Sequence, residues 1–224
     1  EGGKALAEVL FGHYNPAGRL PVSMPRNDHQ LPARNDNFND DFGCGYRYYD
    51  EMNITPEFAF GFGMSYTTFS YDNISISPSS PRVGEPVEIT FDVTNTGKRP
   101  GEEVPQLYVT NKAADIWMPE KELKGFDRIF LAPEETKQVK FTLHPEDFYY
   151  WKESESAYDI FEGDYKVRIG GSSDDLPLEQ SFNYSSDVKK PDLVITELFS
   201  LPKFPLVGEK IHFYALVKNQ GSED

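Results

Sequence analysis

Residues 81–97 read PRVGEPVEITFDVTNTG, and this stretch decides the fold. Its apolar side chains alternate with polar ones, at Val87, Ile89, Phe91 and Val93. A period of two residues is that of a β-strand with one buried face. The run closes on NTG at 95–97, where Asn and Gly favour a tight turn. The stretch therefore predicts a half-buried strand that ends in a turn.

The same alternation recurs in the residues that follow. Apolar residues alternate over 139–143 and 165–169, and shorter strands are indicated at 107–109 and around Ile129. Turn-forming residues separate these runs, as in APE at 132–134 and EGD at 162–164. About seven short strands at this spacing, over about 115 residues, are typical of an antiparallel β-sandwich. The chain is therefore expected to be mainly β.

The opening stretch has a second copy near the end of the chain. Residues 205–221 read PLVGEKIHFYALVKNQG, with Pro, Val-Gly-Glu and the closing Asn-x-Gly in the same register. The corresponding inward-facing residues are Ile211, Phe213, Ala215 and Val217. The repeat predicts a second sandwich that starts near Pro191. Only about two of its strands fall within the chain, so we expect 191–224 to be marginally stable alone.

The first residues follow a helical pattern. Residues 3–11 (GKALAEVLF) place Ala5, Leu6, Val9 and Leu10 on one face of a helix, and Gly12 suits its C-terminal cap. A turn at 15–18 then leads to a short strand or an extended exit expected over 19–24. A helix this short is not stable by itself, so it should pack on a domain outside these residues.

Two segments join this helix to the sandwich. Residues 26–42 are polar and suit a surface connection, whereas 45–50 (GYRYYD) and 58–69 (FAFGFGMSYTTF) are rich in aromatics and Gly. We interpret the aromatic segments as an ordered linker that packs between two domains. The aromatic residues expected in that contact are Tyr46, Tyr48, Tyr49, Phe60, Phe62, Tyr66 and Phe69.

Composition limits the classes of function. The 224 residues carry 37 acids against 22 bases, a formal charge of -15, which disfavours nucleic acid and anionic membrane surfaces as partners. Cys44 is the only cysteine, so no internal disulfide forms, and no apolar run is long enough to span a bilayer. The chain starts at Glu1 without an initiator Met and ends at Asp224, so we expect both ends to be cuts in a longer protein.

The acidic residues and histidines do not form a pattern that indicates a catalytic or metal-binding site. Acidic neighbours occur at Asp40-Asp41, Glu102-Glu103 and Asp174-Asp175, but adjacent strand residues point to opposite faces and do not cooperate as acid and base. The histidines, His13, His29, His144 and His212, are far apart and have no ligand spacing. We therefore expect no catalytic residue, no cofactor site and no metal site in this chain.

Two further motifs have competing interpretations. Gly61-Phe62-Gly63 superficially suggests a nucleotide loop, but it lacks a third glycine and opens no helix, which favours close backbone packing in an aromatic cluster. Trp117, Trp151, Tyr149 and Tyr150 could form a platform for sugar rings, although packing in a core or domain interface is favoured. Trp117 is the aromatic of this set expected to be exposed.

Several of these segments together resemble the carboxyl-terminal end of family 3 glycoside hydrolases. The motifs are GHYNPAGRLPVSMP at 12–25, GYRYYD at 45–50, FAFGFGMSYTTF at 58–69, and then QLYV at 106–109, KELKGF at 121–126 and GGSSD at 170–174. The resemblance covers about residues 1–184 and departs from the family at 40–44, just before GYRYYD. Residues 191–224 resemble the start of a CARDB-type module, a bacterial extracellular β-sandwich.

The resemblance implies a domain plan. Residues 1–28 would end an α/β sandwich domain, 29–68 would be the linker, 69–186 a fibronectin type III-like domain, and 191–224 a truncated CARDB-like sandwich. It also implies a retaining, β-glucosidase-like parent that acts on an oligosaccharide or aryl glycoside, with two carboxylates about 5–5.5 Å apart. The family carries both carboxylates upstream of these motifs, so no catalytic residue is carried over and the fragment alone is expected to be inactive.

Two functions follow from these observations. The first is an accessory tail that stabilises the catalytic domains of a bacterial enzyme, extracellular or periplasmic, with no cofactor and no membrane insertion. The alternative is a non-enzymatic adhesion or glycan-binding array of sandwiches, which the internal repeat favours. The helix and the NPAGRLP segment at 15–21 argue against the alternative, because an array of β-sandwiches does not need these elements.

Overall fold

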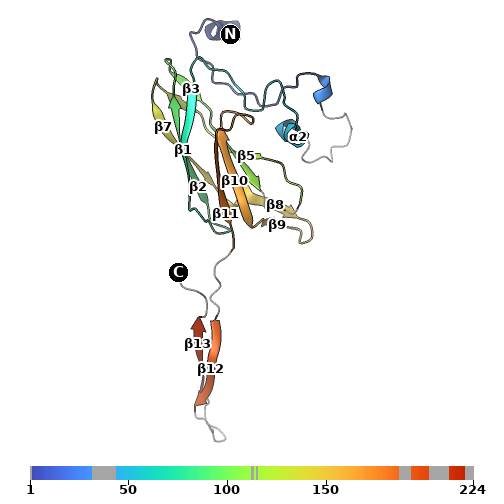
Figure 1. Cartoon of the computed structure of the whole chain (residues 1–224), viewed down its shortest axis with the longest axis vertical. Coiled ribbons are helices and arrows are strands. Elements are labelled where there is room, and N and C mark those ends of the chain that lie inside the picture. Colours follow the sequence, from blue (N-terminus) through green and yellow to red (C-terminus); the bar gives the residue numbers. More distant parts are fainter. Residues whose placement is uncertain are drawn as a thin grey trace. The chain divides into compact units, whose positions relative to one another are not determined.

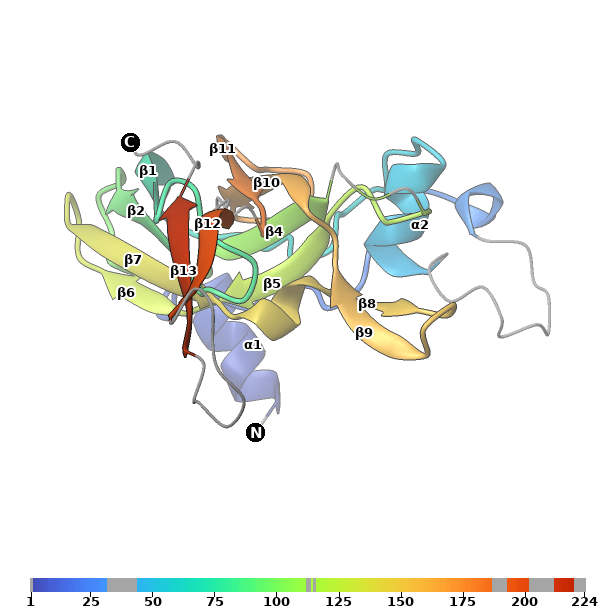
Figure 2. The ribbon, with the colours of Figure 1, turned by 90° about the horizontal axis from the view of Figure 1, so that it is seen from below.

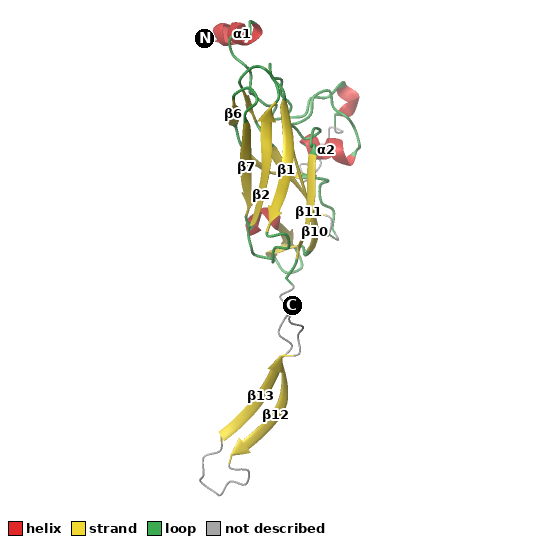
Figure 3. Cartoon of the chain, turned by 60° about the vertical axis from the view of Figure 1, so that its left-hand side comes forward, coloured by secondary structure: helices red, strands yellow, loops and turns green. Residues whose placement is uncertain are grey.

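A computed structural model describes residues 2–31, 44–111, 114, 116–186, 193–201 and 212–219 (Figure 1). The chain divides into two compact units, Glu1–Ser185 and Ser186–Asp224. The first unit is built mainly of strands and loops, with few helices (Figure 3). The predicted mainly β fold is confirmed. Asp40-Asp41 and the departure at 40–43 lie outside the described residues, as do most of 26–42.

One sheet contains the strand predicted from the opening stretch. Strands β1 (Phe69–Ser77), β2 (Val87–Asn95) and β7 (Thr136–Leu143) pair antiparallel in the order β1-β2-β7. On β2, the alternate residues Val87, Ile89, Phe91 and Val93 are completely buried. The predicted period of two is therefore correct, and it marks the face of the sheet that packs inward.

A second sheet packs against the first. Strands β4 (Gln106–Asn111), β5 (Glu122–Phe126), β10 (Gly163–Gly170) and β11 (Leu178–Tyr184) form it, antiparallel, in the order β11-β10-β4-β5. The two sheets lie side by side in Figure 2, and their inner residues form one core that includes Phe91, Leu107 and Val167. The arrangement is the expected antiparallel sandwich.

One end of the core is aromatic. Phe148, from the short 3₁₀ helix η2 (Pro145–Phe148), packs against aromatic rings of the neighbouring strands β10 and β11. Its ring centroid is 5.2 Å from that of Tyr165 and 4.8 Å from that of Tyr184. Tyr165 also stacks on Phe182 at 5.6 Å. Tilted and edge-to-face contacts of this kind add to the area that the rings bury.

The described sandwich has eleven strands, more than the seven expected. Four of the strands are short: β3 (Gly101–Glu103) pairs with β6 (Ile129–Leu131), which the run around Ile129 predicted, and β8 (Tyr149–Lys152) pairs with β9 (Ala157–Ile160). Runs of three or four residues carry too few positions to show alternation, and Gly and Glu in β3 disfavour a strand by propensity. Tertiary pairing overrides that local preference.

The helical prediction at the start is confirmed, and of the two alternatives for 19–24, a short strand or an extended exit, the strand does not form. Helix α1 (Gly2–Leu10) is followed by Gly12 with φ of 74°, the left-handed conformation expected of a C-terminal cap. Within 19–24, Met24 alone forms an isolated bridge, with Phe58, while Leu20 donates its backbone N–H to the Phe62 carbonyl. Pro21 and Pro25 have no N–H, so a regular ladder cannot form.

The segment GYRYYD is helical, which its composition did not indicate. Helix α2 (Gly45–Glu51) contacts the outer face of the four-stranded sheet through Tyr46. Tyr46 lies with its ring centroid 5.8 Å from that of Tyr108 on β4, and its hydroxyl accepts from the backbone N–H of Leu123. These contacts explain why β4 is buried on both faces. A 3₁₀ turn, η1 (Asp28–Gln30), precedes α2.

The second unit contains an antiparallel pair of strands, β12 (Leu193–Leu201) and β13 (His212–Asn219). Strand β13 coincides with the alternating part of the repeat, so the strand prediction is confirmed there. Ala215, one of the predicted inward residues, is exposed, and so is its neighbour Leu216. Two strands offer no opposing layer against which a face could be buried. Ile211 lies outside the described residues.

Candidate functional site

Helix α1 presents an apolar surface to solvent. None of its residues is buried, and Leu10 and Phe11 are 69% and 79% exposed, with Leu6 similar. Leu6 and Leu10 lie on the face that the helical period predicted to be a packing face, and Phe11 directly follows the helix. A nine-residue helix gains little stability from its own hydrogen bonds, so an apolar face of this size marks a surface for a partner.

The segment after α1 is tied to the sandwich by Asn15. Its amide N–H donates to the Pro100 carbonyl at 3.0 Å, and its amide oxygen accepts from the Tyr66 backbone N–H at 2.8 Å. The Tyr66 hydroxyl in turn donates to the carbonyl of Val9 in α1 at 2.6 Å. Asn15 thus links α1, the 58–69 segment and the sandwich. We call the packed segments 12–25 and 58–69 the junction.

A buried ion pair lies at the centre of the junction. The Arg19 guanidinium contacts the Glu103 carboxylate at 2.7 Å, and the side chains are 11% and 5% exposed. The Tyr71 hydroxyl donates to the other carboxylate oxygen at 2.8 Å. Burial, and then the charge of Glu103, raises the pKa of Tyr71 far above its usual value, so it remains a donor.

The motif Gly61-Phe62-Gly63 is a place of close backbone approach, as expected. A Cβ on Gly61 would lie 2.1 Å from the Gln106 side chain, and one on Gly63 would lie 2.3 Å from the Gly18 carbonyl. The Gln106 amide donates to the carbonyls of Gly61 and Gly171. The two glycines thus approach a buried amide and the junction backbone, while Phe62 packs on Phe58 and Phe60 on Tyr46, so the segment also belongs to an aromatic cluster as expected.

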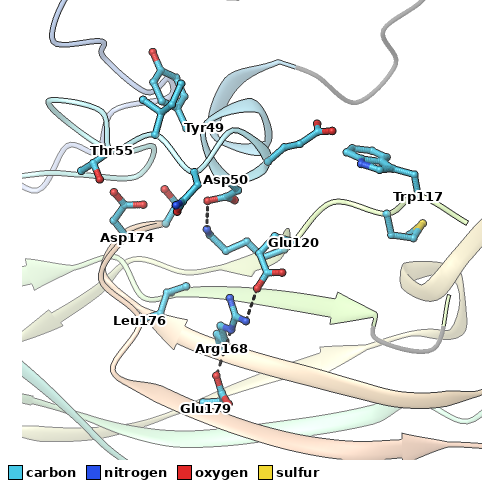
Figure 4. A pocket seen from close by; sticks show the side chains of 15 residues that line it. Tyr49, Asp50, Thr55, Trp117, Glu120, Arg168, Asp174, Leu176 and Glu179 are labelled. Carbon is cyan, nitrogen blue, oxygen red and sulfur yellow. Dashed lines mark hydrogen bonds and ion pairs between the residues drawn. The ribbon is translucent and has the colours of Figure 1, made fainter. Parts of the chain in front are cut away.

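A cleft of about 920 Å³ lies between α2 and the ends of β10 and β11 (Figure 4). Charged side chains dominate its lining. Lys121 pairs with Asp50, while Arg168 pairs with Glu120 at 2.6 Å and with Glu179 at 3.3 Å. Trp117 stands at the cleft, 42% exposed, which confirms its expected exposure. The ion pairs connect α2 to the sheet.

Asp50 is the buried acid of this cleft. One carboxylate oxygen binds Lys121, and the other is buried without a hydrogen-bond partner. Burial raises the pKa of Asp50, with Lys121 opposing the shift and the charges of Asp174 and Glu120 adding to it. The cations that line the cleft are already paired with its carboxylates, so its chemistry is that of a charged contact between two elements.

The β8–β9 hairpin carries an exposed aromatic face, which we call the hairpin face and which consists of Tyr149, Trp151 and Tyr158. Trp151 and Tyr158 are cross-strand partners, with ring centroids 5.3 Å apart and planes at 77°. Tyr149 stacks on Tyr158 at 5.9 Å. The three side chains are 47%, 51% and 68% exposed in sequence order. Packing in a core or a domain interface was the favoured expectation for Tyr149 and Trp151, and the exposure of both side chains shows that the core alternative is wrong.

Tyr150 lies on the other side of the hairpin. Its ring stacks on Phe161 at 3.7 Å, in keeping with the period of two along β8. It therefore does not join Tyr149 and Trp151, and the four-residue platform considered from the sequence does not form. Tyr158, which the sequence did not single out, takes the central place because the β8–β9 register sets it opposite Trp151.

Comparison with known proteins identifies these elements. Residues 1–66 match the glycosyl hydrolase family 3 C-terminal domain, and residues 103–173 match the fibronectin type III-like domain. The chain matches the C-terminal part of family 3 β-glucosidases. The predicted family resemblance is confirmed for these regions. The two matching family models cover 1–66 and 103–173, so they do not support the CARDB-like resemblance of 191–224.

Relatives of the family 3 β-glucosidases align over most of the chain. Thermostable beta-glucosidase B of Acetivibrio thermocellus is 40% identical over 195 residues, which is 84% of this chain and 26% of that protein. The periplasmic beta-glucosidase of Salmonella typhimurium is 41% identical over 77% of this chain and 23% of its own length. The chain thus spans about a quarter of the curated relatives it matches.

Solved β-glucosidase structures share the fold. The beta-D-glucoside glucohydrolase of Trichoderma reesei superposes with a TM-score of 0.74 at 28% identity, covering 81% of this chain and 28% of that one. Beta-glucosidase 3B of Thermotoga neapolitana, in complex with glucose, gives 0.73 at 32% identity and covers 81% of this chain and 26% of its own. The sandwich and the junction therefore belong to a known architecture.

The structure separates the acidic neighbours considered above. Glu103 is buried against Arg19, whereas Glu102 faces the other way and pairs with Arg128. Asp174 lines the cleft, and Asp175 caps the loop through its backbone. Within the described ranges, no group of three or more His, Cys, Asp or Glu side chains could hold a metal, and no helix could cross a membrane. No local pattern around Arg19, Asn15 or Lys121 indicated the roles of these residues.

Proposed function

We propose that this chain is the accessory carboxyl-terminal part of a β-glucosidase-like enzyme, and that it stabilises the enzyme's catalytic domains. The observation that carries the proposal is the exposed face of α1 beside a junction that is rigidly bonded to the sandwich. Leu10 and Phe11 are largely exposed among the residues that the structure describes. The α1 region matches the C-terminal domain of family 3, so the rest of that domain is the natural partner.

On this proposal the reaction is a retaining hydrolysis of an oligosaccharide or aryl glycoside. Two carboxylates about 5–5.5 Å apart would act as nucleophile and acid/base. They would come from the three quarters of the relatives' length that this chain does not span. The sandwich would act on catalysis indirectly, by holding the domain that carries α1.

The proposed domain plan keeps the boundaries set out from the sequence. Residues 1–28 close the α/β domain, 29–68 form the linker, 69–186 form the fibronectin type III-like domain, and 191–224 begin a CARDB-like sandwich. The β12–β13 pair and the repeat of 81–97 support the last assignment. The periplasmic name of the Salmonella relative supports an extracellular or periplasmic location in a bacterium.

The test compares substitutions on α1 with one elsewhere. Leu10→Ser and Phe11→Ser should leave the thermal unfolding midpoint of the 224-residue chain unchanged, because the side chains are already exposed. In the full-length gene product each should cost about 2–4 kcal/mol of stability and lower β-glucosidase activity after heating. Phe126→Ser, 68% exposed on β5, is the matched control and should change neither protein.

An unchanged full-length protein would refute the accessory role of α1. A full-length product without any glycosidase activity would favour the second candidate, an adhesion or glycan-binding array. The aromatic hairpin face and the internal repeat are the observations in favour of that candidate. The α1 face and the family match over 1–66 weigh against it.

A further inference from the structure

The hairpin face is unexplained by the accessory role. It lies at the end of the sandwich opposite to α1 (Figure 1), away from the exposed apolar residues of that helix. Strand β8 contributes Tyr149 and Trp151, two residues apart, and β9 contributes Tyr158, which lies opposite Trp151 and whose ring contacts both of the others. Three large aromatic side chains, each about half exposed or more, cost free energy in water unless something binds to them.

We propose that the hairpin face binds a neutral polysaccharide chain. An aromatic ring carries negative charge on its face, and the C–H bonds of a sugar ring, polarised by neighbouring oxygens, carry positive charge. Sugar rings therefore stack on exposed aromatic faces. The phenol hydroxyls of Tyr149 and Tyr158 and the indole N–H of Trp151 lie on the same rings and can bond sugar hydroxyls.

The charges around the hairpin argue against an anionic ligand. Its cation, Lys152, is paired with Glu155 at 2.7 Å and with Asp159 at 3.3 Å, so it is neutralised within the hairpin. The turn adds the exposed carboxylate of Glu153, and the whole chain has a formal charge of -15. An acidic polysaccharide or a nucleic acid would be repelled.

The size of the hairpin face argues against a protein partner. A stable protein interface buries about 800 Å² on each side, with aliphatic residues around its aromatic anchors. Three partly exposed rings offer a few hundred Å² at most. The loop that borders them is KESES at 152–156, which is polar. A narrow face of aromatic rings with a polar border suits a single chain of sugars.

Polar groups also border Tyr149. A cavity of about 20 Å³ next to it is lined by Asn111, Glu122, Lys124 and Asp147 among others. This volume is close to that of one water molecule, so it can admit a hydroxyl but not a sugar ring. A sugar stacked on Tyr149 would therefore present its edge to hydrogen-bonding side chains of the sandwich.

This inference rests on the proposed function, since it gives a glycosidase a place to hold polymeric substrate away from its catalytic carboxylates. The test is affinity electrophoresis of the 224-residue chain in native gels that contain neutral mixed-linkage β-glucan. The wild-type chain should be retarded. Trp151→Ala and Tyr158→Ala should each weaken the binding at least tenfold, and Trp151→Phe should retain most of it.

Trp117→Ala is the matched control, because Trp117 is the second tryptophan, is similarly exposed and lies at the cleft. It should bind as the wild type does. Each variant should keep the wild-type unfolding midpoint, which separates lost binding from lost folding. If Trp151→Ala lowers the unfolding midpoint, Trp151→Phe still tests the proposal, because the proposal requires only an aromatic ring at position 151 for β-glucan binding.

Three results would overturn the proposal. The first is a wild-type mobility that the β-glucan does not change, and the second is full binding by Trp151→Ala and Tyr158→Ala. The third is self-association of the wild-type chain in size-exclusion chromatography that Trp151→Ala abolishes, because a second copy would then cover the face. Failure of the proposed function would be recognised separately, as absence of glycosidase activity in the full-length protein.

Discussion

Single residues in the junction decide how the N-terminal segment is held. Glu103 satisfies two groups at once, the Arg19 guanidinium and the Tyr71 hydroxyl, in a site where its side chain is 5% exposed. A buried charge that loses its partner is far more costly than an exposed one, because water cannot replace the lost contact. Glu102, the next residue, is part of an exposed pair with Arg128 and offers a direct comparison.

We therefore expect Glu103→Gln to lower the free energy of unfolding by about 3–5 kcal/mol. Glu102→Gln should cost only about 0–1 kcal/mol, since exposed ion pairs contribute little. Both variants change one charge at neighbouring positions of β3, so net charge does not distinguish them. Denaturant unfolding of the 224-residue chain measures both values. Equal effects would show that Arg19 and Glu103 are not coupled as the structure indicates.

At this scale the sequence was informative only where chemistry shows in a local pattern. Gly12 and the Gly61-Phe62-Gly63 motif were predictable, because a left-handed backbone or a close approach requires glycine. The pairing of Arg19 with Glu103 was not, because the two residues are 84 positions apart and nothing near either one indicates its partner. A buried ion pair has no sequence period.

At the scale of elements, the strands of the sandwich enclose several tyrosine hydroxyls. Burial is the main cause that raises the pKa of Tyr71 on β1, Tyr108 on β4 and Tyr165 on β10 far above the usual value. A higher pKa in the folded state means that folding favours the protonated phenol. This stability is complete below the pKa of an unfolded tyrosine and is lost as the pH rises above it.

Spectrophotometric titration should show this directly. At about pH 11 a free tyrosine is mostly ionised, so the unfolded chain should show nearly all 13 tyrosinates. The folded chain should show fewer, and the missing ones should ionise together with unfolding at higher pH. Titration in denaturant is the control. Identical curves in the two conditions would mean that these hydroxyls are accessible to water in the folded protein.

Elements with one buried face were predictable from the sequence, and elements without a continuous apolar face were not. Strand β2 has one face in the core and alternates cleanly, so its position was predictable. Helix α2 is short, has no apolar stripe and is positioned by Tyr46 and Arg47, which contact residues more than 60 positions away. The hairpin face was predictable only in part. Trp151 was a candidate from the sequence, but the sequence did not indicate the strand register that places Tyr158 opposite it.

At the scale of the whole molecule, the two units differ in how much they can bury. The first unit has two sheets around one core, whereas the second has a single described pair of strands in which Ala215 and Leu216 are exposed. An isolated pair of strands is marginally stable in water, because neither face is covered. The same sequence motif therefore forms a stable strand in β2 and a marginally stable strand in β13.

Amide hydrogen exchange should separate the two copies. Backbone amides of β2 should be protected to the level of global unfolding, and those of β13 should exchange quickly. The two strands carry the same motif, so each is the control for the other. Comparable protection of β13 and β2 would show that β13 is covered by structure beyond a strand pair. The measurement needs only the 224-residue chain.

The junction has a consequence for how such tails can be exchanged between enzymes. Arg19, Asn15 and Gly61 complete the surface of a sandwich that begins, by strand order, at Phe69. A recombination breakpoint at 69 would transfer Glu103 and Gln106 without the groups that satisfy them. The segment that can be exchanged between enzymes without loss of these contacts therefore starts upstream of Asn15. It includes both the junction and the sandwich, because each satisfies polar groups of the other.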